Sequence, residues 1–252
     1  MKIYKYCPVS KHSIDNLKNC MLMFSTPNNF NDKQDSNLPL TNVNSIEVKE
    51  KYRKEILNLS EEEKSKIKKL TPPKGFFEDL GVKNINDLFN NVSENLNSSI
   101  NIEEKFNEYK SKYVGITCFS ERFDNEKMWK NKDYGYNHKG FCLCFETDND
   151  PVFFKDFEKI NYEDELPKHN LLCSEKERKE ELKKNFTTKL KDKFSYEEEY
   201  RLIVNNKPGL YEYNKFSLIE IYLGKDINLV DKKSIFSTLK KVYRDNVYVT
   251  QL

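Results

Sequence analysis

The chain has 252 residues, of which 37% are hydrophobic and 33% are charged. This length is enough for one sizeable domain with a hydrophobic core, or for two small domains. A net charge of +2 argues against nucleic-acid binding over the whole surface and leaves only local basic patches for that role. The 17 Phe and 15 Tyr residues predict a core rich in aromatic side chains.

The first 48 residues predict a strand, a short helix and a second strand, followed by a loop. Ile3–Tyr6 predicts the first strand, and the helix that follows has its N-cap at Ser13 or a neighbouring residue. Cys20–Ser25 predicts the second strand, which Thr26 and Pro27 end. Residues 35–48 show no periodicity, so we expect a loop there.

The middle of the chain has the apolar spacing of a helix. Tyr52, Ile56 and Leu59 recur at intervals of three and four residues, with many charged residues between them. We therefore predict a mainly helical insertion at about 47–112 within a single domain that spans residues 1–252. The charge runs in this segment are typical of solvated helix faces.

The second half contains most of the clear strand signals. The predicted elements are strands at Tyr113–Ser120, Gly140–Glu146, Tyr200–Val204 and Ile219–Leu223, an extended segment near Ile160–Tyr162, a charged helix at Ser174–Lys193 and a last short strand at Val247–Thr250. The strands come in clusters and do not alternate regularly with helices. This pattern predicts an α+β fold with a mixed, mainly antiparallel sheet.

The cysteines and the hydropathy predict a cytoplasmic protein that does not enter a membrane. None of the six cysteines forms a Cys-x-x-Cys motif, and Cys142 and Cys144 lie on one strand face where a mutual disulfide has poor geometry. The first residues do not resemble a signal peptide. No apolar run approaches the roughly 20 residues that a membrane-spanning helix needs.

Several motifs in this order resemble the bacterial domain of unknown function family 2971. The matching positions are Tyr4–Tyr6, Leu17, Phe24–Pro27, Phe30–Asp32, Cys118–Glu121, Asp124, Asn125, Met128, Trp129, Tyr134, Asn137–Phe141, Tyr196–Arg201, Ile221, Leu223 and Gly224. The family usually continues Phe-Asn-Asp with Pro-Phe-Asp, whereas this chain has Lys33, Gln34 and Asp35. Because the family has no assigned activity, the resemblance implies a set of recurring positions but no reaction.

Tyr196–Val204 carries the strongest chemical signal, a Glu-x-Glu pair followed by an arginine. Alternation along a strand would place Glu197, Glu199 and Arg201 on one face, and the two tyrosines and Glu198 on the other. One interpretation is a structural ion pair between Glu199 and Arg201 at a sheet edge. The other is that the motif is similar to the catalytic pair of mono-ADP-ribosyltransferases, which implies a fold like theirs and NAD as substrate. Two carboxylates there would stabilise an oxocarbenium-like transition state.

Other parts of the ADP-ribosyltransferase pattern are only partly present. On the first strand, Lys5 or Tyr6 stands where a residue that binds NAD is expected, but the usual Arg or His is missing. Either Ser25 or Ser120 fits the serine expected at a strand end.

The remaining polar and aromatic residues leave more than one role open. His138, in a loop beside a lysine, suits a general acid or base, a phosphate contact or an ordinary surface histidine. Trp129 suits core packing better than a stacking platform for a base. The three histidines share no metal-ligand spacing. The basic stretch at Lys176–Lys193 favours an exposed helix over a nucleic-acid site.

We predict that one concave site collects these residues. Its catalytic residues would be Glu199, Glu197 and His138, and its substrate-binding residues Tyr4, Lys5, Ser25, Asn31, Asp32, Ser120, Trp129, Tyr134 and Arg201. The leading hypothesis is an enzyme that acts on NAD or another nucleotide, with no permanently bound cofactor or metal and with a nucleic acid or protein as a possible acceptor. Its context would be stress response, toxin action or phage defence. The alternatives are a non-catalytic module that binds nucleic acid or protein, and a nuclease or phosphodiesterase, which the lack of a metal-ligand cluster disfavours.

Overall fold

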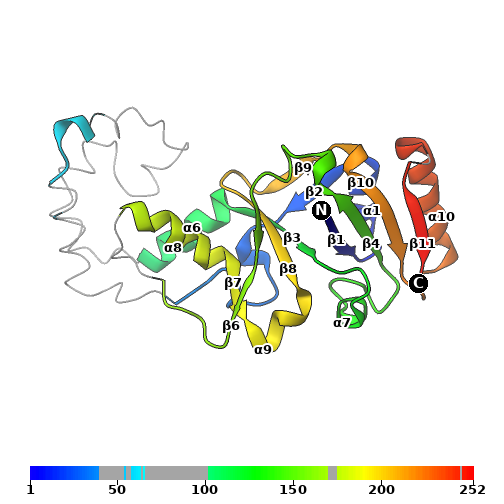
Figure 1. Ribbon diagram of the computed structural model, residues 1–252, viewed down its shortest axis with the longest axis horizontal. Helices are drawn as coiled ribbons and strands as arrows, with labels where there is room; N and C mark the ends of the chain where they lie inside the picture. Colours follow the sequence, from blue (N-terminus) through cyan, green and yellow to red (C-terminus); the bar gives the residue numbers. More distant parts are fainter. Residues whose placement is uncertain (40–53, 55–57, 64, 66–101, 170–174, 245) are drawn as a thin grey trace. The chain divides into compact units, whose positions relative to one another are not determined.

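The computed structural model describes residues 1–39, 54, 58–63, 65, 102–169, 175–244 and 246–252 (Figure 1). The chain forms two compact units, one made of Met1–Leu38, Lys110–Pro167 and Lys183–Leu252, the other of Pro39–Tyr109 and Lys168–Leu182. Most of the predicted insertion at 47–112 lies outside the described residues, although residues 61–63 and α6 (Ile102–Tyr113) are helical.

All the strands that the structure describes belong to the first unit. They are β1 (Lys2–Cys7), β2 (Met21–Phe24), β3 (Gly115–Ser120), β4 (Phe141–Glu146), β5 (Phe157–Lys159), β6 (Asn161–Glu163), β7 (Thr188–Leu190), β8 (Glu199–Val204), β9 (Gly209–Glu212), β10 (Leu218–Leu223) and β11 (Tyr248–Gln251). The other described helices are α1 (Lys11–Lys18), α7 (Glu126–Lys130), α8 (Glu175–Thr187), α9 (Lys191–Phe194) and α10 (Leu229–Thr238), which a π-helical turn over Leu239–Tyr243 continues.

Seven strands form the main sheet, in the order β11-β10-β4-β1-β3-β8-β5. Its neighbouring strands are antiparallel except β10 and β11, which are parallel. Two further pairs stand apart from it, β2 with β9 and β6 with β7. The prediction of an α+β fold with a mixed, mainly antiparallel sheet is therefore confirmed.

The two faces of the sheet carry different side chains. One face packs Ile3, Phe119, Phe145 and their neighbours into the larger apolar core, which α1 and α10 cover through residues such as Leu17 and Ile235. Several rings in this core meet edge to face, a geometry that favours aromatic pairs. The aromatic composition is thus used for burial.

The other face holds a smaller cluster around α7. Met128 and Trp129 pack there with Tyr6 from β1 and with Cys142 and Cys144 from β4. The edge of the Tyr6 ring meets the Trp129 ring, with 5.1 Å between the ring centres. Asn125 begins α7 by accepting hydrogen bonds from the two backbone amides at Lys127 and Met128, so the turn that carries Trp129 is firmly capped.

Several predicted boundaries are wrong. The first helix is capped by Ser10 and not by Ser13, because the two serines form a capping box at its start. The charged helix predicted to reach Lys193 ends at Thr187, where the β-branched pair Thr187 and Thr188 leads into β7. In addition, α10 and β9 were not predicted from the sequence periodicity.

The five described cysteines are free thiols, and Cys173 lies outside the described residues. Within the part of the chain that the structure describes, no helix has the length and apolar character required to span a bilayer.

Candidate functional site

The main sheet opens between β1 and β3. At one end of β3, Tyr4 pairs with Ser120, whereas at the other end Ile116 exchanges two backbone hydrogen bonds of 2.9 Å with Ser25, which follows β2. Lys5 fills the fork between these two pairings. Its Nζ donates to the carbonyl oxygen of Cys118 at 3.0 Å and to Thr117 Oγ1 at 2.9 Å. The side chain thus bonds a β3 carbonyl where the two strands separate.

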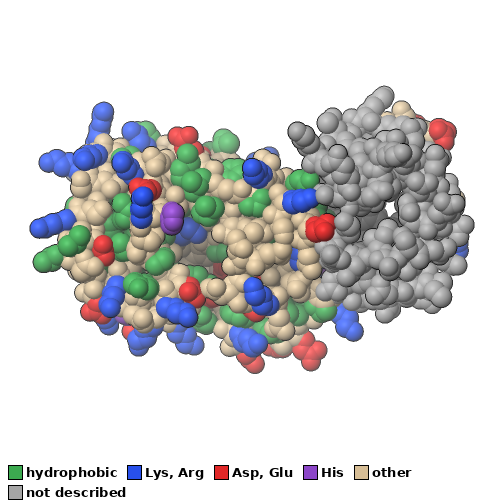
Figure 2. All heavy atoms as spheres, turned by 180° about the vertical axis from the view of Figure 1, so that it is seen from behind, with side chains coloured by type: hydrophobic (Ala, Val, Ile, Leu, Met, Phe, Trp, Pro, Cys, Tyr) green, Lys and Arg blue, Asp and Glu red, His purple; other side chains and the backbone are tan. Residues whose placement is uncertain are grey.

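A cavity of about 320 Å³ lies at this fork. Its walls come from the two diverging strands, the loop after β2, the loop after α7 and the segment that leads into β8. Figure 2 shows a hollow in the described part of the molecule, flanked by acidic and basic side chains. The lining residues that matter for chemistry are Lys5, Ser25, Asn31, Asp32, Asp35, Cys118, Asp133, Tyr134, Lys189, Tyr196, Glu197 and Glu199.

The two glutamates of the Glu-x-Glu motif reach the cavity by an irregular backbone. The predicted strand alternation from Tyr196 is wrong, because Ser195–Glu197 is a single 3-10 turn and β8 begins only at Glu199. Glu198 between them has a left-handed backbone with φ of 44°, and its carbonyl oxygen accepts from the amide of Glu121 at 2.9 Å. The Ser120 hydroxyl donates to the Glu197 carbonyl oxygen at 2.8 Å. These bonds to the end of β3 hold both carboxylates on the same side.

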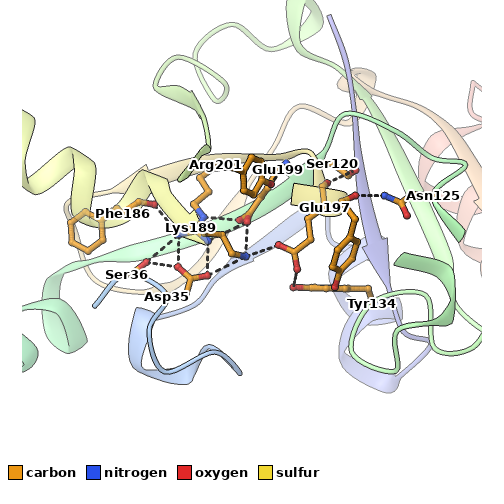
Figure 3. A network of polar contacts seen from close by, with 12 residues as sticks. Asp35, Ser36, Ser120, Asn125, Tyr134, Phe186, Lys189, Glu197, Glu199 and Arg201 are labelled. Atoms are coloured by element: carbon orange, nitrogen blue, oxygen red, sulfur yellow. Dashed lines mark hydrogen bonds and ion pairs between the residues drawn. The ribbon is translucent and has the colours of Figure 1, made fainter. Parts of the chain in front are cut away.

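Arg201 binds two carboxylates at once (Figure 3). Its Nε and Nη2 donate to the two oxygens of Glu199 at 2.6 and 3.2 Å. Its Nη1 and Nη2 donate to the two oxygens of Asp35 at 2.8 and 2.6 Å. Further bonds run to Ser36 Oγ and to the carbonyl oxygen of Phe186. Arg201 is completely buried, and such a group is tolerated only when its donors are paired.

The ion pair of Glu199 and Arg201 is therefore not at a sheet edge, as one interpretation of the sequence supposed. Strand β8 lies between β3 and β5, and both side chains are buried. Breaking this pair would leave an uncompensated charge in the interior, whereas an exposed pair would contribute little.

Lys189 is the second cation of the network. It is the central residue of β7. Its Nζ lies 2.5 Å from Glu197 Oε2, 3.0 Å from Glu199 Oε2 and 3.4 Å from Asp35 Oδ2. Only 5% of its surface is exposed. The prediction that the whole basic stretch is an exposed helix is wrong at this residue, because the three carboxylates draw its side chain inward.

The environments of Glu197 and Glu199 shift the pKa values of the two carboxyl groups in opposite directions. Burial raises the pKa of Glu197 to about 7, although Lys189 acts in the opposite direction. Burial would also raise the pKa of Glu199, but Arg201 and Lys189 outweigh it and hold that pKa below its usual range. The Tyr134 hydroxyl donates to Glu197 Oε1 at 3.3 Å. The cavity therefore presents one carboxylate that titrates near neutrality and one that stays ionised.

This difference predicts that Glu197 titrates near pH 7. In a protein labelled with ¹³C at the glutamate side chains, we expect the Glu197 carboxyl signal to move with a midpoint of about 7. The signal is assigned by its absence in Glu197→Gln. A midpoint near 4.5, the ordinary value for glutamate, would contradict the geometry of the site.

A smaller cavity of about 60 Å³ adjoins the first on the same glutamates. It shares Lys5, Tyr6, Cys118, Tyr134, Glu197 and Glu199 with the larger one and adds Tyr4, Phe119, Ser120 and Met128. Its volume is enough for one or two water molecules.

The predicted site residues divide into three groups. Lys5, Ser25, Asn31, Asp32, Tyr134, Glu197 and Glu199 line the larger cavity, and Tyr4 and Ser120 line the smaller one. Arg201 lies behind the carboxylates. Arg201, His138 and Trp129 line neither cavity, so the prediction that all these residues converge on one concave site is wrong for these three. The predicted substrate-binding role of Arg201 is wrong because the residue is completely buried and its donors bind groups of the protein.

His138 belongs to a separate packing arrangement. Tyr136, Asn137 and His138 all have left-handed backbones, and the His138 ring stacks on Trp129 with 5.8 Å between the ring centres. His138 Nε2 lies 3.2 Å from Glu126 Oε1. The Trp129 indole donates to the carbonyl oxygen of Phe123, and the residue is almost fully buried. The predicted role of Trp129 in core packing is confirmed.

Sequence reasoning missed Asp35 and Lys189 as members of the site. Asp35 stands in a stretch without periodicity, and its only signal was the final acid that it shares with the family pattern. Lys189 is one of many lysines, and no local signal marks it. Among the described residues, no group of three or more His, Cys, Asp or Glu side chains is arranged to hold a metal.

Comparisons of the chain with protein-family models, with curated proteins and with solved structures found no match. The resemblance to the bacterial domain of unknown function stays a prediction, which these comparisons neither support nor contradict.

Proposed function

We propose that the chain is a cytoplasmic enzyme that breaks the bond between nicotinamide and ribose in NAD, with transfer of the ADP-ribosyl group to water or to another acceptor. The observation that carries the proposal is the pair of buried glutamates on one cavity wall, one ionised and one titrating near neutrality. This division of labour between two carboxylates is typical of glycosyl-transfer sites.

The reaction needs a fixed charge and a proton acceptor. As the carbon–nitrogen bond breaks, nicotinamide leaves with the electron pair and positive charge develops on the ribose. The buried network supplies the opposing charge, since Asp35, Glu197 and Glu199 exceed Lys189 and Arg201 by one negative charge when Glu197 is ionised. The acceptor oxygen then attacks the ribose carbon, and its proton moves to the Glu197 carboxylate.

The charge of the cavity favours a cationic ring over a phosphate. Its walls carry five carboxylates, from Asp32, Asp35, Asp133, Glu197 and Glu199, and two lysines, Lys5 and Lys189. Asp32 and Asp133 make no ion pair with any described residue. The rings of Phe30, Phe194 and Tyr196 add aromatic surface of the kind that holds cations, and Arg201, Lys189 and Lys127 already lie over them. The nicotinamide of NAD is a planar cation, whereas a phosphodiester would meet repulsion here.

The volume also suits part of a dinucleotide. A cavity of about 320 Å³ is at the lower end of the range for small-molecule sites, so it would hold the nicotinamide riboside half and leave the rest of NAD outside. The proposal includes an arrangement like that of the ADP-ribosyltransferases and a role in stress response, toxin action or phage defence, which follow from the sequence resemblances.

The test is incubation of the pure protein with NAD and measurement of released nicotinamide. Release above a heat-inactivated sample supports the proposal, and the fate of the ADP-ribosyl group then separates hydrolysis from transfer. The absence of both nicotinamide release and NAD binding would overturn it. Tight binding of RNA or of a protein without any turnover would instead favour the non-catalytic module.

A further inference from the structure

Lys189 occupies a defined position although it is the middle residue of a strand of only three residues, β7. Strand β7 pairs in parallel with β6, with Lys189 opposite Tyr162. The hydroxyl of Tyr162 accepts from the backbone amide of Glu199 at 2.9 Å, which connects β6 to the start of β8. The Lys189 ammonium also lies 4.5 Å from the centre of the Phe194 ring. Its backbone and its side chain are therefore both held.

The three carboxylates around Lys189 differ in whether a second cation also pairs with them. Asp35 and Glu199 are also bound by Arg201 through two hydrogen bonds each. Glu197 has no such second partner, because Lys189 is the one cation within ion-pair distance of it among the described residues. Removing Lys189 would leave Asp35 and Glu199 paired, but it would leave Glu197 without a cation.

We propose that Lys189 is a positioning residue that holds the Glu197 carboxylate for catalysis, by donating to Oε2 while Oε1 accepts from Tyr134. The catalytic part of this inference depends on the proposed function, but the control of Glu197 by Lys189 does not. Figure 3 shows the arrangement, with Glu197 between Lys189 on one side and Tyr134 on the other.

The other charged and titratable groups that act on Glu197 are known. They are Glu199 and Arg201 from β8, Tyr134 from the loop after α7, Tyr162 from β6 and the neighbouring Tyr196. Of these, only Arg201 is cationic, and it makes no ion pair with Glu197. The ammonium of Lys189 is therefore the main group that favours the ionised carboxylate.

The experiment replaces Lys189 with Met and follows the Glu197 carboxyl signal by ¹³C NMR. We expect the pKa of Glu197 to rise by about one to three pH units, because the adjacent opposite charge is lost. The acid limb of nicotinamide release should move to higher pH by the same amount, and Lys189→Arg should restore most of both. The matched control is Lys191→Met, two residues along the chain, where the lysine is exposed and should leave both measurements unchanged.

Two results would overturn the inference. One is a Glu197 titration that does not move in Lys189→Met although the melting temperature drops, which would make Lys189 purely structural. The other is an equal change in Lys191→Met. If Lys189→Met does not fold, Lys189→Gln, which keeps an N–H donor without the charge, is titrated in its place with the same expected shift. If the wild type does not release nicotinamide, the proposed function fails, while the NMR titration still decides the role of Lys189.

Discussion

Glu197→Gln is expected to lower nicotinamide release by about 10²–10⁴-fold, the usual effect of losing a positioned acid–base group. The side chain keeps its shape and can still accept from Tyr134, but it cannot take a proton from the acceptor. The substitution also removes the negative charge that stabilises the developing cation on the ribose. The measurement is the steady-state rate of nicotinamide release at saturating NAD.

The pH dependence of this rate follows from the same residue. The ionised form of Glu197 is the active one, and its pKa is about 7. The wild-type rate should therefore fall as the pH decreases below 7, by about tenfold per pH unit well below the midpoint. The residual rate of Glu197→Gln should lack this limb, since the group that titrates is gone.

Glu198→Gln is the control for this experiment. Glu198 is the next residue, but its carboxylate lies 3.8 Å from Arg122 and lines neither cavity. Its replacement should leave the rate and the pH profile unchanged. Full activity of Glu197→Gln, or an equal loss in both variants, would remove Glu197 from the mechanism.

The sequence predicted the parts of the fold that depend on local patterns. Strands β3, β4, β8 and β10 are uninterrupted apolar or alternating runs, and the structure places each within two residues of its predicted bounds. The clustering of these runs was enough to predict a mainly antiparallel sheet. Strand β9 was missed because its sequence, Gly-Leu-Tyr-Glu, is neither an apolar run nor an alternation of apolar and polar residues.

The site was only partly predictable because its charges meet over long distances in the chain. Arg201 and Asp35 are 166 residues apart and still share two hydrogen bonds. The Glu-x-Glu motif identified one wall, but periodicity says nothing about which of many lysines turns inward, as Lys189 does. Conversely, His138 drew interest as a loop histidine, whereas its place beside Trp129 is decided by an unusual left-handed turn.

Glu199→Gln is expected to reduce the free energy of unfolding by about 3–5 kcal/mol, the range for breaking a buried ion pair. Glu199 accepts two hydrogen bonds from Arg201 and one from Lys189, all in the interior. A neutral amide cannot balance these cations, and its NH₂ group would point a donor at another donor. Urea or thermal unfolding at pH 7 measures the effect.

The stability difference should also depend on pH in a definite direction. The pKa of Glu199 in the folded protein is held below the usual value of 4.5, because Arg201 and Lys189 outweigh the effect of burial. Its contribution to stability is therefore complete above pH 4.5 and is lost as the pH falls through the lowered pKa. The gap between the wild type and Glu199→Gln should accordingly narrow below pH 4.5.

Glu121→Gln is the matched control for stability. Glu121 pairs with Lys159 at 2.9 Å, but both side chains are about half exposed, so its replacement should cost only about 0–1 kcal/mol.

The specific activity of the Glu199→Gln protein that remains folded then distinguishes a structural role of Glu199 from a catalytic one. If this specific activity is lower than that of the wild type, the negative charge of Glu199 belongs to the groups that stabilise the ribose cation. A lower melting temperature with unchanged specific activity would instead confine Glu199 to holding Arg201 and Lys189 in place, and would leave Glu197 as the sole acting carboxylate of the site.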